Sequence, residues 1–226
     1  SYPPLYTIYM KENIKPMIKT YIKTNKKVLP YFLFLPGYLL AFFLLETFIS
    51  GDGSYWSSHI FLDDYIPFLE GFVIFYCLWY PFMIVPGLYL FFKDIPEFKR
   101  YIWYLICAFA ICFAVYILVP NGQDLRPEVF ERDNIFTYII GLIYSADTNT
   151  NVFPSMHVAG ALGAAEAFFR TDGLKKYRAV SVITAVLICA STVFIKQHSL
   201  LDVFGGIAVW LISHITVYRI FRRADC

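Results

Sequence analysis

Polar side chains suited to phosphoryl transfer occur in three short stretches of an otherwise apolar chain. In the last of these stretches, His198 and Asp202 are four residues apart, a spacing that stacks them on one face of a helix. A carboxylate there can accept the imidazole N–H and leave a free lone pair on the second ring nitrogen. Such a histidine can act as a nucleophile or a base, although an acid also holds purely structural histidines in this way.

The second stretch, Pro154-Ser155-Met156-His157, has the composition of a helix start. The free N–H groups of a first helical turn bind phosphate, and Ser155 adds a hydroxyl at that turn. His157 would lie beside the bound anion, where an imidazole can protonate a departing alkoxide. The alternative is that Pro-Ser simply begins a membrane helix.

The remaining stretch contains Arg126, whose guanidinium can hold phosphate oxygens with two hydrogen bonds. The alternative for Arg126 is an ordinary loop ion pair with Asp124 or Glu128. Lys196 could add a positive charge to the site, or could mark the level of the lipid headgroups. Together the three stretches predict a site for phosphoryl transfer. A metal site built from the two histidines and the aspartate is a weaker alternative, because it gives Arg126 no role.

The composition indicates that membrane-spanning helices position these residues. Of the 226 residues, 58% are hydrophobic and only 16% are charged, which excludes a disordered chain and a typical soluble enzyme. A net charge of +2 gives no support for nucleic-acid binding. A membrane span needs about 20 apolar residues. We expect six spans, at residues 31–50, 67–92, 101–119, 153–169, 177–195 and 201–221.

The distribution of basic residues predicts the orientation of these spans. Sixteen of the 19 lysines and arginines fall in the N-terminal stretch, the C-terminal tail and alternate loops. By the positive-inside rule, both termini are cytoplasmic, and the loops 51–66, 120–152 and 196–200 face outward. All three polar stretches then lie at the outer face of the membrane.

These observations predict an all-α fold, a six-transmembrane-helix bundle with its active site at the outer membrane face. Residues 1–30 would form a basic cytoplasmic segment, and residues 31–226 the six-helix domain. In the basic segment, lysines recur every four residues at Lys11, Lys15, Lys19 and Lys23, as on an amphipathic helix that lies on an anionic membrane surface. An ordinary solvated helix would show the same pattern.

Two further patterns concern the packing and the outer loop. Small residues follow both histidines, at Gly160, Gly163, Gly205 and Gly206, and would let two membrane helices approach closely. The loop 120–152 contains an apolar stretch, Ile135 to Tyr144, that could lie in the interface as a short helix and line an entrance for lipid. The acids of this loop, Asp147 among them, would disfavour strongly anionic headgroups and attract a cationic one. An ordinary acidic outer loop is the alternative.

The chain resembles the type-2 phosphatidic acid phosphatase superfamily, over roughly residues 31–221. That family has three sequence blocks: Lys-x6-Arg-Pro, Pro-Ser-x-His and Ser-Arg-x5-His-x3-Asp. The second block is present as Pro154-Ser155-Met156-His157, and the third as Ser191-Thr192 followed by His198 and Asp202. The first block keeps only Arg126-Pro127.

The resemblance implies a role for each matching residue. His198 would attack phosphorus to give a phosphohistidine, and Asp202 would orient it. His157 would protonate the leaving group and then activate water. Arg126 and the turn at Ser155 would hold the phosphate. Members of the family need no metal, so we expect no cofactor.

Two of the family's phosphate-binding cations are absent. Val119 stands where the first block has lysine, and Thr192 where the third has arginine. Lys196 is the candidate replacement. A reduced set of cations is similar to the branch that contains sphingomyelin and inositol phosphorylceramide synthases, which transfer a headgroup between lipids. A phosphodiester carries less charge than a phosphomonoester, so fewer cations suit it.

We therefore expect a lipid phosphatase that hydrolyses a lipid phosphate or pyrophosphate at the outer leaflet. The first alternative is a lipid headgroup phosphotransferase of the same fold, and the second is a non-catalytic lipid carrier or sensor. The expected partners are a membrane lipid and the bilayer, with no nucleic acid. The sequence leaves the lipid and the oligomeric state open.

Overall fold

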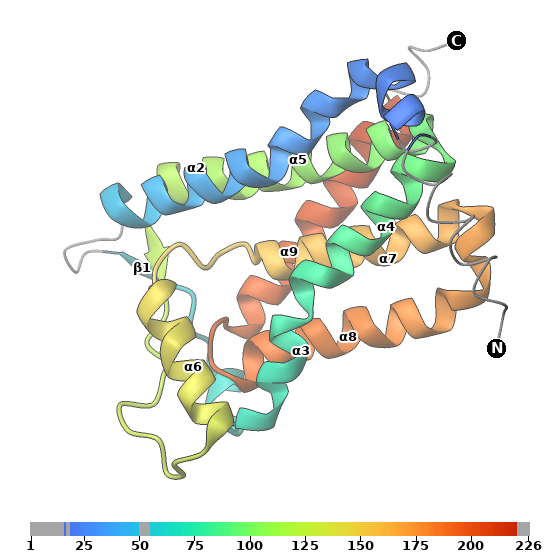
Figure 1. Ribbon diagram of the computed structural model, residues 1–226. Helices are drawn as coiled ribbons and strands as arrows, with labels where there is room; N and C mark the ends of the chain where they lie inside the picture. The colour runs from blue at the N-terminus through green and yellow to red at the C-terminus, as the bar shows by residue number, and fades with distance from the viewer. Residues whose placement is uncertain (1–15, 17–18, 50–54, 221–226) are drawn as a thin grey trace, which may run out of the picture.

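The computed structural model describes residues 16, 19–49 and 55–220, and the chain is mostly helical, at 78% (Figure 1). This confirms the expected helical class. Lys11 and Lys15 of the expected lysine stripe lie outside the described residues.

The elements follow one another along the chain as helices with short connections. The first half contains η1 (Lys26–Leu33), α2 (Phe34–Ile49), β1 (Trp56–Ser57), η2 (Phe61–Tyr65), η3 (Glu70–Phe72), α3 (Val73–Cys77), α4 (Trp79–Lys93) and α5 (Ile95–Leu118). The second half contains β2 (Asn121–Gly122), α6 (Ile135–Ala146), α7 (Met156–Arg170), η4 (Asp172–Tyr177), α8 (Arg178–Phe194), α9 (Leu200–His214) and η5 (Ile215–Ile220).

Five helical stretches of the described chain are long and apolar enough to cross a membrane. They are Lys26–Phe48, Glu70–Lys93, Ile95–Leu118, Asp172–Phe194 and Leu200–Arg219. These stretches match five of the six expected spans and fit an integral membrane protein. The sixth expected span, 153–169, forms α7, which has 15 residues and does not reach that length. The total of six spans therefore stays a prediction.

Helix α7 lies at the centre of the bundle, in contact with α4, α5, α8 and α9. Ten of its 15 residues are buried, and most of these are alanine or glycine. Their small side chains let the neighbouring helices approach closely. A Cβ on Gly163 would overlap the ring of Tyr104. On the other side, a Cβ on Gly206 of α9 would lie 2.6 Å from the main-chain oxygen of Ser155.

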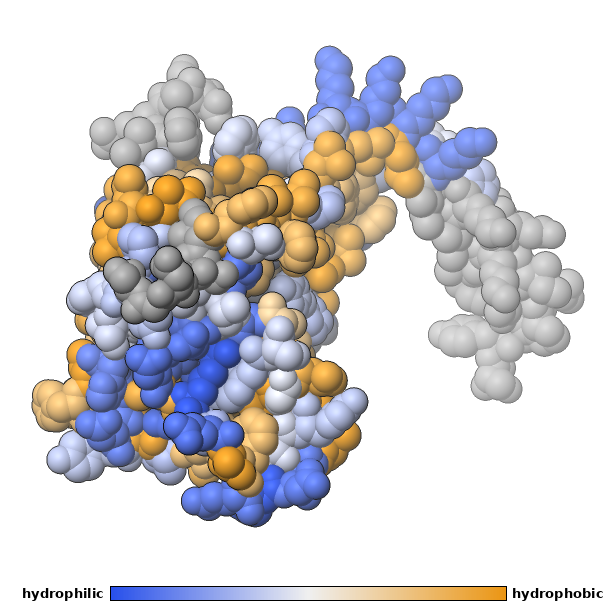
Figure 2. All heavy atoms as spheres, turned by 90° about the vertical axis from the view of Figure 1, so that its left-hand side faces the viewer, coloured by the Kyte–Doolittle hydropathy of each residue, from blue (hydrophilic) through white to orange (hydrophobic). Residues whose placement is uncertain are grey.

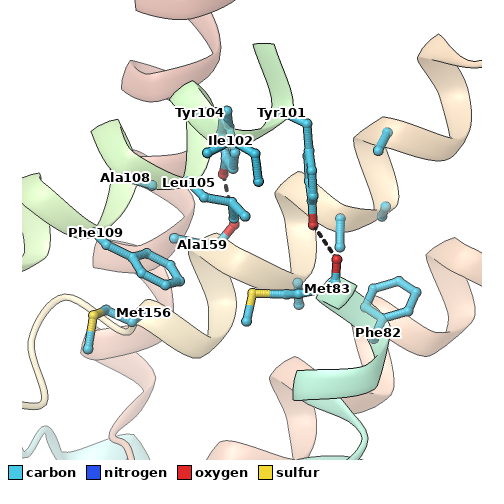
Figure 3. Packing of buried hydrophobic residues seen from close by; sticks show 14 of the residues in the cluster. Phe82, Met83, Tyr101, Ile102, Tyr104, Leu105, Ala108, Phe109, Met156 and Ala159 are labelled. Carbon is cyan, nitrogen blue, oxygen red and sulfur yellow. Dashed lines mark hydrogen bonds between the residues drawn. The ribbon is translucent and has the colours of Figure 1, made fainter. Parts of the chain in front are cut away.

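Buried tyrosines fasten the helices around α7 to one another (Figure 3). The hydroxyl of Tyr104 on α5 donates a hydrogen bond of 2.8 Å to the main-chain oxygen of Ala159 on α7. The hydroxyl of Tyr101 donates one of 3.0 Å to the main-chain oxygen of Met83 on α4. Phenol groups thus satisfy their polar atoms inside an otherwise apolar core.

The expected run 67–92 is divided into η3, α3 and α4, and the break falls at Leu78. Proline removes a backbone donor and its ring clashes with the carbonyl four residues earlier. Pro81 therefore disturbs the helix at Cys77, directly before this break. Pro86 lies inside α4 without ending it.

The end of the bundle at which α7 begins is closed by loops tied together through the main chain. Strands β1 and β2 pair in parallel, with Trp56 opposite Asn121. The buried side chain of Asn121 accepts hydrogen bonds from the N–H groups of Val152 (2.9 Å) and Phe153 (2.7 Å). This network fixes the segment that leads into α7. The apolar stretch of the long loop forms the short helix α6, as expected.

Basic residues gather at the opposite end of the bundle, where α4, α7 and α9 end and α5 and α8 begin. A buried ionic network joins three helices there. Arg170 pairs with Glu97 on α5 (3.0 Å) and with Glu166 (3.2 Å), and Glu166 also contacts His214 on α9 (2.7 Å). Figure 2 looks onto the other end, where hydrophilic residues gather on the lower half of the face beneath a hydrophobic upper part.

Candidate active site

His198 lies in the tight connection between α8 and α9. The main-chain oxygen of Thr192 accepts hydrogen bonds from the N–H groups of Gln197 (2.9 Å) and His198 (3.0 Å), which fixes the connection against the end of α8. Ser199 then caps α9 in a reciprocal arrangement with Asp202. The N–H of Ser199 donates to Asp202 Oδ2 (2.8 Å), and the N–H of Asp202 donates to Ser199 Oγ (3.2 Å).

The carboxylate of Asp202 orients the ring of His198. Their Nδ1 and Oδ2 atoms are 3.3 Å apart, and both side chains are buried. A carboxylate accepts but does not donate, so this contact places the ring proton on Nδ1. The Nε2 atom of His198 therefore keeps its lone pair, as the i, i+4 spacing predicts.

His157, the second residue of α7, faces His198. Its Nδ1 lies 3.4 Å from Nε2 of His198. The rings of Tyr76 and Trp79 pack on His157 at centroid distances of 4.5 and 4.4 Å, which holds the imidazole in place. The structure thus brings both histidines and Asp202 into one chain of contacts, from three points of the sequence.

Ser155 is the N-cap of α7. Its Oγ accepts a hydrogen bond from the N–H of Val158 (3.4 Å), and its own N–H donates to the main-chain oxygen of Asp202 (3.0 Å). Ser155 is fully buried. The residue therefore starts α7 and also joins it to the first turn of α9, so the two histidine-bearing helix starts are held together.

A cavity of about 260 Å³ lies in front of the two histidines. Its wall consists mainly of aromatic and apolar side chains from α2 to α7, with a few polar groups: Tyr38, Phe42, Tyr76, Tyr80, Tyr116, Ile143, Ala146, Asp147, Asn151, Val152, Met156, His157, Gln197 and His198. Met156 and His157 bring the N-terminus of α7 to this wall. Among the residues that the structure describes, no three His, Cys, Asp or Glu side chains are grouped as metal ligands.

Arg126 lies beside the cavity but is not part of its wall. The guanidinium donates to the main-chain oxygens of Tyr144 (3.3 Å), Asp147 (2.9 Å) and Thr148 (2.6 Å), and to Oε1 of Gln197. It also stacks over the ring of Tyr144, 4.4 Å from the centroid. Burial lowers the pKa of Arg126 from its ordinary value. The guanidinium therefore acts on the cavity indirectly, by polarising the amide of Gln197 in the cavity wall.

Lys196 points away from the cavity. Its Nζ donates to the main-chain oxygens of Asp63 (3.0 Å) and Ile66 (2.7 Å) in the segment between β1 and η3. The carboxylate of Asp63 in turn accepts a hydrogen bond from the N–H of Leu200 (2.8 Å). Lys196 thus holds this segment against the connection that carries His198.

Neither position with a missing family cation supplies another polar group to the cavity. Val119 is exposed just after α5. Thr192 is buried in α8, and its hydroxyl donates to the main-chain oxygen of Cys189 (2.8 Å). Thr192 contributes instead through its main-chain oxygen, which holds the connection before His198.

Among the cavity residues that were not predicted as site residues, Tyr76, Asp147 and Gln197 form one polar group. The hydroxyl of Tyr76 donates to Asp147 Oδ2 (3.3 Å), and Nε2 of Gln197 lies 3.4 Å from the same oxygen. The position of Gln197 directly before His198 was a usable signal. The acid content of the long segment between β2 and α7 was a weaker signal for Asp147. Nothing in the sequence marks Tyr76.

Asp147 is the carboxylate of the cavity wall. It is half-buried between the end of α6 and the start of α7. Burial raises the pKa of its carboxyl to about 6, and the nearby carboxylate of Glu46 acts in the same direction. Glu46 on α2 accepts hydrogen bonds from the N–H of Thr148 (3.2 Å) and the amide of Asn151 (2.9 Å), beside the same wall.

The arrangement is a helical bundle with five stretches apolar enough to cross a membrane and with a paired-histidine site at one end. A family model described as the PAP2 superfamily matches residues 130–216, which include His157, His198 and Asp202. The match confirms the resemblance to the type-2 phosphatidic acid phosphatase superfamily and supports a phosphatase or phosphotransferase activity on lipid phosphates. No curated protein and no solved structure matches the chain.

Proposed function

We propose that this protein is a membrane lipid phosphatase that works through a phosphohistidine at His198. The observation that carries the proposal is the chain of contacts from Asp202 to His198 to His157. It supplies a nucleophile with a fixed lone pair and, beside it, a second imidazole for proton transfer.

The reaction would take two steps. In the first, Nε2 of His198 forms a bond to phosphorus while the bond from phosphorus to the lipid oxygen breaks, and protonated His157 gives that oxygen its proton. In the second, neutral His157 takes a proton from water as the water oxygen attacks phosphorus. The P–N bond breaks, and His198 regains its lone pair. No cofactor enters this sequence.

The phosphoryl group has to enter between the two histidines. Nδ1 of His157 lies 3.4 Å from Nε2 of His198. It therefore occupies the side of Nε2 from which phosphorus must approach for attack. The charge developing on the phosphoryl oxygens would be met by the N-terminus of α7 and by Gln197, which Arg126 polarises. Lys196 would act indirectly, by fixing the connection that carries His198.

We place the site at the outer face of the membrane, with both termini in the cytoplasm. The support is the separation of charges along the bundle: basic residues gather at one end, and the histidines lie at the other. The positive-inside rule assigns the basic end to the cytoplasm. The substrate would then be a lipid of the outer leaflet.

Headgroup transfer to a lipid alcohol is the second candidate, and a specific observation favours it. No lysine or arginine of the described chain is part of the cavity wall. A phosphomonoester dianion would have to be bound with little direct positive charge, whereas a phosphodiester carries one negative charge. In this case a lipid alcohol, instead of water, attacks the phosphohistidine.

The test compares wild type with His198→Ala and His198→Gln in detergent, using lipid phosphomonoesters and phosphodiesters. Inorganic phosphate and new lipid products are both measured. Phosphate release that both variants lose supports the phosphatase. A new phospholipid without phosphate supports the transferase. Equal turnover by the variants would exclude His198 catalysis, and lipid binding without turnover would indicate a carrier or sensor. His59→Ala, at an exposed histidine that is not part of the cavity wall, is the matched control.

A further inference from the structure

We propose that the cavity binds a lipid phosphodiester whose headgroup carries a positively charged ammonium group, and that Asp147 recognises this group. This inference rests on the proposed cleavage of a lipid phosphate at His198 and names the substrate class for it.

The first argument is the charge of the cavity. The wall contains two histidines and a carboxylate, Asp147, and its other residues are neutral near pH 7. A second carboxylate, Glu46, lies just behind the wall and contacts Thr148 and Asn151. A phosphate dianion alone would be repelled by this surface, whereas a zwitterion brings its own positive charge to it.

The second argument is that no cation of the protein neutralises Asp147 directly. In the described part of the chain, its carboxylate forms no ion pair and contacts the neutral groups of Tyr76 and Gln197. Arg126 is close, but its guanidinium binds the main-chain oxygen of Asp147 (2.9 Å) and not the carboxylate. A half-buried carboxylate without an ion pair is costly, and a cationic ligand would remove that cost.

The third argument is the aromatic wall. Four tyrosines, Tyr38, Tyr76, Tyr80 and Tyr116, line the cavity together with Phe42. Aromatic rings attract ammonium groups through their electron-rich faces, and a set of rings with one carboxylate is how proteins bind quaternary ammonium ligands. Lysine or arginine side chains would instead be expected along a wall that binds a phosphate dianion alone, and the wall contains none from the described chain.

The fourth argument is position and size. Tyr76 hydrogen-bonds Asp147 and packs on His157, and Gln197 contacts Asp147 directly before His198. A single side chain, Tyr76 or Gln197, therefore separates the carboxylate from the position of each histidine. This spacing suits a headgroup in which a short linker joins the ammonium group to phosphorus. A volume of about 260 Å³ suits a headgroup better than whole acyl chains.

In this reaction Nε2 of His198 bonds to phosphorus, and the bond to the diacylglycerol oxygen breaks as that oxygen takes a proton from His157. The phosphoryl group, still esterified to the amino alcohol, stays on His198. Water or a lipid alcohol then attacks phosphorus, gives its proton to His157 and releases the headgroup from His198.

The experiment measures kcat/KM for dihexanoyl phosphatidylcholine and dihexanoyl phosphatidylglycerol in maltoside micelles, for wild type, Asp147→Asn and Asp133→Asn. Asparagine keeps the shape of the side chain and removes its charge. We expect wild type to prefer the choline lipid and Asp147→Asn to lose at least about tenfold of that preference. Asp133 is an exposed acid of the same outer loop, so Asp133→Asn is the matched control with an unchanged preference.

Calorimetric binding of the same two lipids to the His198→Ala variant gives a second readout that needs no turnover. Tighter binding of the choline lipid that Asp147→Asn abolishes supports the inference. Cleavage of the glycerol lipid that depends on His198, with no choline preference in rate or binding, would overturn it and leave the proposed function standing. Full turnover by His198→Ala would overturn the proposed function instead, and the binding measurement would then decide the inference alone.

Discussion

Replacing Gly206 with alanine should disable the site without touching any polar group. In the first two turns of α9, a Cβ on this residue would lie 2.6 Å from the main-chain oxygen of Ser155 and 2.7 Å from Cβ of Val158. The first atom belongs to the main chain and the second is attached directly to it, so no change of rotamer can move either atom away. The starts of α7 and α9 would have to separate by about 0.8 Å to restore an ordinary contact of 3.4 Å.

This separation acts directly on the reacting atoms, because His157 is the second residue of α7 and His198 lies two residues before the start of α9. A misplacement near 1 Å costs about 100-fold in rate, so we expect kcat to fall about 10–100-fold. The added methyl group should also cost about 1–3 kcal/mol of stability, which corresponds to a Tm lower by roughly 2–10 °C in a chain of this size.

The measurement is kcat with the best lipid substrate, together with a thermal unfolding curve in the same detergent. Gly37→Ala is the matched control, since a Cβ on Gly37 of α2 meets no atom within 4 Å. Alanine favours the helix more than glycine, so this control should keep its activity and its Tm. A Gly206→Ala protein with wild-type kcat and Tm would refute the idea that this close approach sets the distance between the histidines.

Three further predictions address the acid of the site, the headgroup and the opposite end of the bundle. Asp202→Asn can donate its amide to Nδ1 of His198 and so select the wrong tautomer; kcat should fall by about 10⁴-fold while calorimetric lipid binding persists. Asp147 ionises as the pH rises through its pKa of about 6, so the choline preference should increase about tenfold between pH 5 and pH 7. A flat ratio of kcat/KM for the two lipids would contradict that assignment, and the ratio cancels the titration of the catalytic histidines. Arg170→Met removes the ion pairs that Arg170 forms with Glu97 and Glu166, while Glu97 keeps Arg100 and Glu166 keeps His214; the free energy of unfolding should therefore fall by about 1–3 kcal/mol, measured as a lower Tm on heating.

The parts of the site that the sequence predicts correctly are those governed by local geometry. The contact between His198 and Asp202 follows from a four-residue spacing on a helix. The cap at Ser155 follows from the preference of serine for the residue before a helix. Five apolar runs are long enough to be read as spans by composition alone. None of these features depends on how the rest of the chain folds.

The parts that the sequence does not predict depend on contacts between distant segments. Asp147 and Tyr76 are 71 residues apart and meet only because α3 and α6 pack together. The start of α7 falls at Met156 and not at 153, because the preceding segment is tied to Asn121 and to α9.

Lys196 shows how such contacts change the chemistry of a site. Its place two residues before His198 suggests a phosphate ligand, yet its backbone is left-handed, with φ of 55°, and its side chain binds the main-chain oxygens of Asp63 and Ile66, away from the cavity. The guanidinium of Arg126 is likewise occupied by main-chain oxygens. In this chain the positive charges of Lys196 and Arg126 hold loops together. The cationic headgroup that we propose would bring a positive charge to Asp147, the carboxylate of the cavity wall, where the protein itself places none.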